Sequence, residues 1–209
     1  MSFINRLTEP SLLGIAVFGV ILLLAVTGCQ STSNAPPQGK IDTIAPANPA
    51  PDAAALKPGL AVSYSSISAN SIADVVIAGR GKPGKPLPHL NWQASDTPMM
   101  TSGRATQVSA QITGFIRFSE TGTYVLKIRS NDGVRLSING IKAIEDPTVH
   151  AARFSRTTSL TIKTAGWYKL DMLYFQKGGS AALELYWQPP KAADFVIVPG
   201  EAFTHLAGN

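Results

Sequence analysis

The sequence predicts an all-β protein, an antiparallel β-sandwich preceded by a signal peptide and a disordered tether. Three observations support this prediction. Apolar and polar residues alternate in several short runs, turn residues separate those runs, and no apolar stripe of helical period continues for three turns. About eight to ten strands at such spacing are typical of a sandwich or barrel. The 209 residues suit one domain with appendages, and a single cysteine excludes a disulfide scaffold.

The N-terminal region carries an uncharged apolar run at residues 12–26, with Arg6 before it. This run is shorter than the roughly 20 apolar residues that a membrane-spanning helix needs, and it suits the apolar core of a secretory signal. We therefore expect residues 1–28 to be a signal peptide. An uncleaved membrane anchor beside a chance cysteine is the alternative interpretation.

The only cysteine follows this run in the sequence Val26-Thr27-Gly28-Cys29. An aliphatic residue and two small residues before a cysteine resemble the bacterial lipobox. The resemblance implies that Cys29 takes a diacylglyceryl group, that the signal is cut before it, and that a fatty acid such as palmitate acylates the new amine. Gln30 lacks the charge of the aspartate that retains lipoproteins at the inner membrane. We thus expect a lipid-anchored outer-membrane protein, facing the periplasm or the cell surface, with the membrane as a partner.

Residues 29–58 are expected to be the lipidated cysteine and a disordered tether. The stretch after Cys29 contains six prolines, many alanines and no aromatic residue. Such a composition buries too little apolar surface to offset the entropy lost on ordering. The globular domain is therefore expected at residues 59–209.

The expected strands of the globular domain follow one another closely. Residues 123–130 show the pattern well, because Tyr124 and every second residue after it to position 128 are apolar. Turn residues follow at 131–133, and Asn139-Gly140 is a strong hairpin signal. The strands around these two turns are expected to form a meander. The full set of expected strands is 60–64, 107–118, 123–130, 134–138, 157–163, 167–176 and 181–188.

Two tryptophans bear on the fold and on a binding site. Trp187 shares the apolar face of its run and is expected in the core. Trp92 comes after a loop rich in proline and lysine. Its indole can either stack on a sugar ring or pin the loop to the sandwich, and we favour pinning.

Five ordered landmarks in the globular domain resemble the PA14 domain family. Residues 114–124 and 130–140 are similar to its first half, and residues 165–168, 174–176 and 178–190 are similar to its second half. The resemblance implies a β-sandwich that serves as a binding module, as in bacterial toxins, glycosidases and microbial adhesins.

In the adhesin branch of that family, two consecutive aspartates in the turn aligned with residues 130–133 hold a calcium ion that binds sugar, and a second loop adds ligands. The resemblance implies that Asn131 and Asp132 are the metal-ligating pair here. Ca²⁺ prefers six to eight oxygen ligands, and sugar hydroxyls can complete such a shell. The candidate ligand-binding residues are therefore Asn131, Asp132, Trp92, Lys177, Gly178, Gly179 and Ser180.

The same loops also have a purely structural interpretation. Asn, Asp and Gly at 131–133 suit a tight turn, and residues 177–180 suit a plain turn between strands. Asp146-Pro147 is either a turn that ends a strand or part of the rim of a nearby site.

No catalytic pattern accompanies these loops. The sequence has no Gly-x-Ser-x-Gly elbow, no His-Glu-x-x-His and no phosphate loop, and its three histidines stand apart. We therefore expect a binding protein rather than an enzyme.

The net charge of +5 is mild. Four cations of adjoining expected strands form either a solvated face or a surface for acidic polysaccharide or anionic lipid. No stacking motif accompanies them, so nucleic acid is not an expected partner. These four cations are Arg117, Lys127, Arg129 and Arg135.

Two functions remain open. The first is carbohydrate binding at the cell envelope, with calcium as the candidate ion and a cell-surface or extracellular polysaccharide as the partner. The alternative is a structural or assembly subunit that docks another envelope protein through the sandwich. A large exposed apolar patch on one sheet would favour the second.

Overall fold

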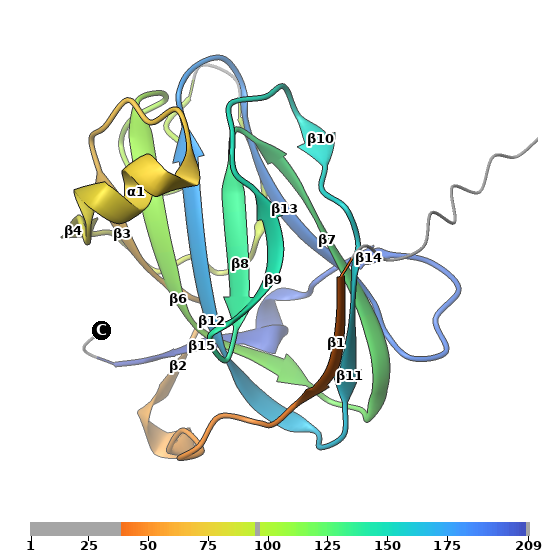
Figure 1. Cartoon of the computed structure of the whole chain (residues 1–209). Helices are drawn as coiled ribbons and strands as arrows, with labels where there is room; N and C mark the ends of the chain where they lie inside the picture. Colours follow the sequence, from red (N-terminus) through yellow and green to blue (C-terminus); the bar gives the residue numbers. More distant parts are fainter. Residues whose placement is uncertain (1–38, 95–96, 208–209) are drawn as a thin grey trace, which may run out of the picture. The chain divides into compact units, whose positions relative to one another are not determined.

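The computed structural model describes residues 39–94 and 97–207. The expected signal peptide and Cys29 lie outside these residues. Two sheets face each other across one apolar core, which confirms the predicted β-sandwich (Figure 1). Sheet A has the order β1 (Gly39–Ile44), β11 (Thr158–Ile162), β7 (Gly122–Asn131), β13 (Ala181–Gln188) and β14 (Val196–Ile197), with β10 (Arg153–Phe154) beside β7 and β5 (Asn91–Ala94) beside β13.

Sheet B forms the second layer and is antiparallel throughout. Its longest pair, β6 with β12, runs in register from end to end. The order is β2 (Leu56–Pro58), β15 (Phe203–Leu206), β6 (Val108–Phe118), β12 (Gly166–Gln176), β8 (Val134–Ile138) and β9 (Ile141–Asp146), with β3 (Ala61–Ser65) beside β6 and β4 (Lys82–Pro83) beside β3. The helical segments are α1 (Ile72–Ala78) and the 3-10 turns η1 (Ala53–Ala55) and η2 (Gly200–Ala202).

Alternation along the strands builds the core between the sheets. In β7, Tyr124 and the two apolar residues at alternate positions after it are buried, as expected. An aromatic cluster fills one part of the core, where the rings of Phe118 and Tyr124 lie 4.7 Å apart and those of Tyr124 and Trp187 lie 5.4 Å apart. Trp187 is 7% exposed, so its predicted place in the core is confirmed.

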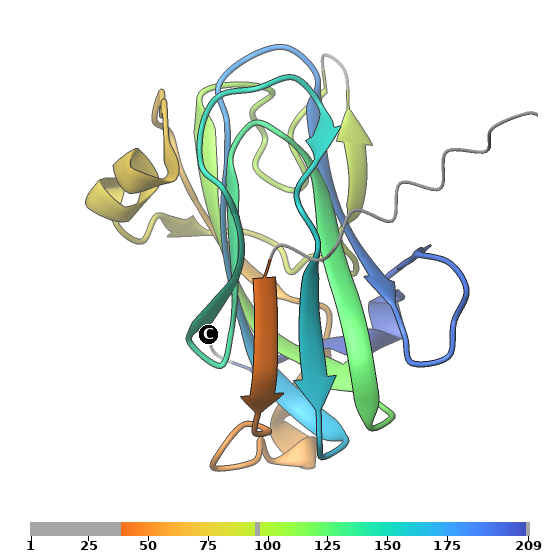
Figure 2. The same ribbon diagram turned by 45° about the vertical axis from the view of Figure 1, so that its right-hand side comes forward.

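The prediction of a disordered tether is wrong for residues 39–58. Strand β1 pairs with β11 in parallel, from Gly39 opposite Thr158 to Ile44 opposite Ile162, and Figure 2 shows the two strands side by side. Ile44 is 4% exposed and belongs to the core, and β2 pairs with β15. Backbone hydrogen bonds to distant strands and the burial of Ile44 offset the conformational entropy that these residues lose on ordering. The proline-rich composition of the stretch does not reveal either contribution.

The predicted meander is also wrong in part. Strand β7 lies in sheet A and β8 in sheet B, so residues 131–133 cross between the layers instead of closing a hairpin. The hairpin between β8 and β9 is confirmed. Asn139 and Gly140 have φ angles of 47° and 78°, the positive values that such a two-residue turn requires.

Helix α1 covers part of the outer face of sheet B. Asp74 accepts hydrogen bonds from the backbone amides of Asn70 and Ser71, at 2.7 and 3.0 Å, which satisfies donors at the helix start. Ile72 and Val75 are fully buried in a small apolar cluster with residues of β12. A helix of two turns shows no long apolar stripe, so the sequence pattern did not predict it.

Both sheets and the core lie within residues 39–207, so this segment has its own complete hydrophobic core. Across the ranges 39–94 and 97–207, no helix combines the length and apolar character needed to cross a membrane.

Candidate functional site

The crossing between β7 and β8 brings together the two loops that the sequence singled out. A peptide bond in cis joins Asn131 to Asp132. Gly133 follows at a point of close approach, because a Cβ atom there would lie 2.5 Å from the ring of Phe175 and 2.8 Å from the carbonyl oxygen of Pro147. Glycine is therefore required here by packing against β12 and the loop after β9.

Asp132 holds three chain segments together. Its side chain is almost fully buried. Oδ1 accepts the backbone N–H of His150 at 3.1 Å, and Oδ2 accepts the backbone N–H of Lys177 at 2.8 Å. The carboxylate thus ties the loop after β9 and the loop after β12 to the β7–β8 crossing, and charge-assisted bonds of this kind are strong.

A buried tyrosine extends this connection to the second loop. The Tyr174 hydroxyl donates to the carbonyl oxygen of Asn131 and lies 3.0 Å from Oε1 of Gln176. The side-chain amide of Gln176 donates to the carbonyl oxygens of Gly178 and Gly179, at 2.7 and 3.2 Å. Burial, and then the negative charge of Asp132, raise the pKa of Tyr174, so its hydroxyl stays protonated and acts as a donor.

The second loop itself lies at the surface. Residues 177–180 are exposed, and Nζ of Lys177 donates to Oδ1 of Asn70 at 2.7 Å. The structure therefore places Lys177 to Ser180 beside Asn131 and Asp132, as the sequence predicted, and the Asp132 carboxylate is used to fix the loop backbone.

Calcium does not fit the donors at this position. Both carboxylate oxygens of Asp132 accept amide hydrogens below the surface, and the carbonyl oxygen of Asn131 accepts the hydroxyl of Tyr174. The pair supplies one negative charge, and the neighbouring loop adds the cation Lys177. In the part of the chain that the structure describes, no three His, Cys, Asp or Glu side chains are grouped to hold a metal ion. A calcium site needs six to eight oxygens free to face the ion.

Trp92 packs on the sandwich. It lies on β5, opposite Leu183 of β13, and its side chain is half-buried against the core. This geometry fits the interpretation in which Trp92 pins its segment to the sheet.

The four cations of the adjoining strands do not share one face, because β7 lies in sheet A while β6 and β8 lie in sheet B. Each has a different local partner. Arg117 stacks over Trp167, Arg129 pairs with Glu184 at 2.7 Å, Arg135 pairs with Glu145 at 2.7 Å, and Lys127 lies over Phe154, Tyr186 and Phe195.

A second candidate site is a groove between β9 and the segment that forms β10 and the start of β11. It consists of two adjoining hollows, of about 520 and about 140 Å³, that share Glu145 and Arg156. We call it the β9–β11 groove. Its larger hollow is lined by Glu145, Asp146, Arg153, Phe154, Ser155 and Arg156.

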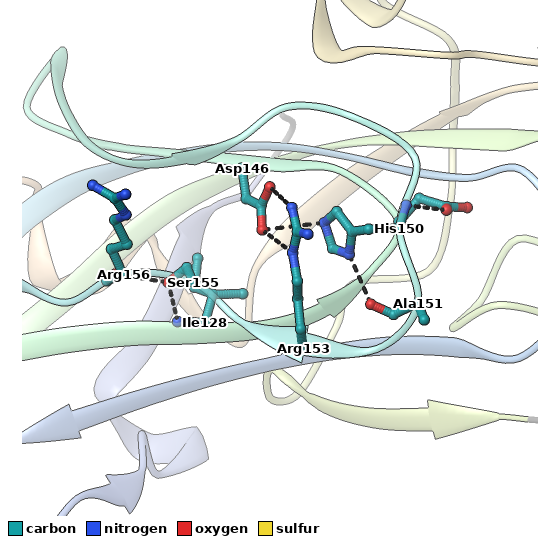
Figure 3. A network of polar contacts seen from close by, with 8 residues as sticks. Ile128, Asp146, His150, Ala151, Arg153, Ser155 and Arg156 are labelled. Atoms are coloured by element: carbon teal, nitrogen blue, oxygen red, sulfur yellow. Dashed lines mark hydrogen bonds and ion pairs between the residues drawn. The ribbon is translucent and has the colours of Figure 1, made fainter. Parts of the chain in front are cut away.

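A network around Asp146 shapes one wall of this groove (Figure 3). Arg153 donates two hydrogen bonds to the carboxylate, from Nε at 2.9 Å and from Nη2 at 2.6 Å. Nε2 of His150 lies 3.3 Å from the same carboxylate, and its Nδ1 lies 2.9 Å from the carbonyl oxygen of Ala151. The hydrogen bonds from Arg153 lower the pKa of Asp146, so this carboxylate remains ionised.

The other carboxylate of the groove is also paired. Glu145 accepts from Arg135 at 2.7 Å and from Nζ of Lys142. The hydrogen bond from Lys142, and then that from Arg135, lower the pKa of Glu145. Arg156 is exposed, and Figure 3 shows its guanidinium directed away from the Asp146 network. Among the described residues it makes no ion pair, so Arg156 offers a free set of donors to a ligand.

Aromatic side chains on the outer face of sheet A continue from the groove. The Phe154 side chain is 48% exposed and lies 5.4 Å from the ring of Tyr186. Nζ of Lys127 lies 4.3 Å from the Phe154 ring and 4.0 Å from the Phe195 ring. Burial lowers the pKa of Lys127. The groove therefore combines hydrogen-bonding groups with an exposed aromatic surface.

Asp146 is the only residue of this groove that the sequence placed near the rim of a site, and the other lining residues were not predicted. Arg153, Phe154 and Arg156 lie in a segment with no motif, and Glu145 lies on the strand opposite. The sole signal was the combination of charged and aromatic residues at 153–156 in a stretch rich in turns. Only the pairing of β10 and β11 with β7 brings them beside β9.

Comparison with known proteins agrees with this architecture. The chain matches the PA14 domain family over residues 56–201 and therefore belongs to that family. No curated protein is similar enough in sequence to count as a relative.

Several solved structures have the same fold. The PA14 domain of the antifreeze protein MpAFP is 16% identical with a TM-score of 0.60, covering 74% of this chain and 93% of that one. A PA14 sugar-binding domain from an RTX adhesin is 17% identical with a TM-score of 0.56, covering 71% and 98%. The Epithelial Adhesin 9 A domain of Candida glabrata, solved with Galβ1-3GlcNAc, is 9% identical with a TM-score of 0.58, covering 77% and 95%.

Proposed function

We propose that this PA14 domain is a carbohydrate-binding module and that the sugar lies in the β9–β11 groove. The observation that carries the proposal is the groove itself, in which an exposed phenyl ring adjoins ionised carboxylates and an unpaired guanidinium. Sugar hydroxyls can donate to the carboxylates and accept from Arg156, while the apolar face of a sugar ring can stack on Phe154. Two structural neighbours, the RTX adhesin domain and the Candida adhesin domain, are sugar-binding by their descriptions.

The proposed site does not use calcium at Asn131 and Asp132. Asp132 instead fixes the loops from below, and the loop Lys177 to Ser180 forms a separate surface. The proposed role is binding without catalysis.

The test is a glycan array followed by calorimetric titration of residues 39–209, with and without calcium. We expect binding to at least one glycan, unaffected by chelation of calcium, and weakened at least about ten-fold by Phe154→Ala or Arg156→Gln. Val196→Ala is the matched control, because Val196 is another exposed apolar residue of sheet A at 49%. Loss of binding in Lys177→Ala with no effect of the groove variants would move the site to the predicted loops. Failure to bind any glycan would refute the proposed function and favour the assembly role.

We also propose that the chain is an outer-membrane lipoprotein anchored through Cys29. The motif at residues 26–29, directly after an apolar run, supports this proposal. Labelled palmitate should enter the protein in cells and be lost in Cys29→Ser. Label that survives the substitution would contradict lipidation at this residue.

A further inference from the structure

Helix α1 presents two adjacent aliphatic side chains to solvent. Ile77 is 83% exposed and Val76 is 53% exposed, while Ile72 and Val75 on the other side of the helix are fully buried. Figure 2 shows α1 projecting from the sandwich. Exposed aliphatic residues placed side by side on a protruding element are typical of surfaces that enter an apolar environment.

A basic loop follows the helix directly. Arg80, Lys82 and Lys85 are exposed, and none of them forms an ion pair within residues 39–94 and 97–207. The acidic residue of α1, Asp74, uses its carboxylate to accept the amides of Asn70 and Ser71. The segment 76–85 therefore combines an apolar tip with three positive charges that have no ion-pair partner among the described residues.

Two glycines hold this basic loop against β3. A Cβ atom at Gly81 would lie 2.0 Å from the carbonyl oxygen of Tyr64, and one at Gly84 would lie 2.5 Å from the Tyr64 ring. Between them, Lys82 pairs with Tyr64 in the β3–β4 ladder. The cations consequently extend from a backbone that is packed on the sheet.

A hollow of about 550 Å³ opens between the end of α1 and β3. Two serines and two cations line it, and hydroxyl and cationic groups are the ones that bind phosphate oxygens. These lining residues are Ser65, Ser66, Arg80 and Lys82.

We infer that α1 and the loop after it bind the surface of a bilayer containing anionic phospholipid. Val76 and Ile77 enter the interfacial region, and Arg80 and Lys82 hold headgroup phosphates at the hollow. A bilayer matches this arrangement because it places a layer of negative charge directly above an apolar interior. A neutral sugar supplies neither property. The inference depends neither on the β9–β11 groove nor on lipidation of Cys29.

The experiment uses residues 39–209, which contain the complete core and no cysteine. Co-sedimentation is measured with vesicles of equimolar phosphatidylglycerol and phosphatidylethanolamine, and with vesicles of phosphatidylcholine alone. We expect binding only to the anionic vesicles, weakened about five-fold by Lys82→Gln, since each basic residue near such a surface adds about that factor. Ile77→Ser should weaken it about ten-fold. Lys163→Gln, an exposed lysine between β11 and β12, is the control for charge.

Insertion is tested separately with an environment-sensitive fluorophore. Its emission should shift to the blue on anionic vesicles when it is attached in Ile77→Cys, and stay unchanged in Val149→Cys, an exposed position at 44%. All of these substitutions are at exposed side chains, so unfolding curves should match that of the unsubstituted protein. The inference is overturned if anionic vesicles at millimolar lipid bind nothing, if phosphatidylcholine binds equally, if the variants bind unchanged, or if the fluorophore at position 77 does not shift.

Discussion

Replacing Asp132 separates a structural role of this residue from a ligand-binding role. Two backbone amides, those of His150 and Lys177, donate to its buried carboxylate. Each hydrogen bond to a charged group contributes about 1.5 to 3 kcal/mol, and the substitution Asp132→Ala leaves both donors without a protein partner. The two contributions bound the loss at about 3 to 6 kcal/mol. Because water can enter the space that the side chain leaves, we expect a value near 3 kcal/mol.

The measurement is urea unfolding of residues 39–209 at neutral pH. Asp132→Asn keeps the shape of the side chain and one acceptor, and turns its second group into a donor that faces an N–H. It should therefore cost about half as much as Asp132→Ala. Amide exchange gives a local readout, because the protection of the His150 and Lys177 amides should fall in both variants.

Asp171→Ala supplies the matched control. Asp171 is on β12, its side chain is 39% exposed, and its pairing with Lys169 is long at 3.8 Å. We expect a change within about 0.5 kcal/mol for this residue. A loss in Asp132→Ala no larger than that of the control would contradict the structural role of Asp132 and return this residue to the role of a ligand.

Two further predictions test the corrected domain boundary and the groove. Ile44→Ala should lower the free energy of unfolding by about 2 to 5 kcal/mol, because Ile44 is buried in the core, whereas Thr43→Ala at an exposed position should change it little. Equal, small effects would show that β1 does not dock. Arg153→Gln should reduce the free energy of unfolding at neutral pH and make that free energy fall less steeply in acid. The reason is that Arg153 lowers the pKa of Asp146 in the folded protein, so as the pH falls below the ordinary value of 3.8 the unfolded chain protonates Asp146 before the folded protein does. Urea unfolding between about pH 3 and about pH 6 measures this, and parallel curves for the two proteins would contradict it.

The long strands were predictable because each one carries its own pattern. Apolar and polar residues alternate in β7 and β12 because one face of each strand is buried. This pattern does not depend on which strands are the neighbours. The sheet to which each strand belongs could not be read in this way. Residues 131–133 have the composition of a hairpin turn, yet they cross between the layers, because contacts with Phe175 and Pro147 decide the path.

Strand β1 shows why the domain boundary was misplaced. It has only two apolar side chains, Ile41 and Ile44. Its burial rests on Ile44 and on a parallel ladder to β11, more than a hundred residues later in the chain. A local count of apolar residues cannot register a strand whose stabilisation comes from a partner so distant in sequence.

The candidate site was also predictable only in part. The sequence correctly placed Asn131 and Asp132 near the loop 177–180, because the family resemblance implies which loops lie together. It could not show that the Asp132 carboxylate is turned inward, because the amide of His150 that binds it lies 18 residues away in a loop without a motif. The β9–β11 groove was hidden for the same reason, as its walls come from opposite sheets.

The new boundary also changes what lipidation at Cys29 would do. If residues 30–58 were all tether, the domain could stand about 90 Å from the bilayer, at about 3.1 Å per residue. With β1 docked from Gly39, only residues 30–38 separate the proposed lipid from the sandwich, and their full extension is about 30 Å. A domain held that close is exposed to lipid at a high effective concentration. The weak affinity expected of two aliphatic side chains on α1 and three cations in the loop after it would then suffice to orient the domain. The anchor and the segment 76–85, proposed on independent grounds, would act together on one membrane.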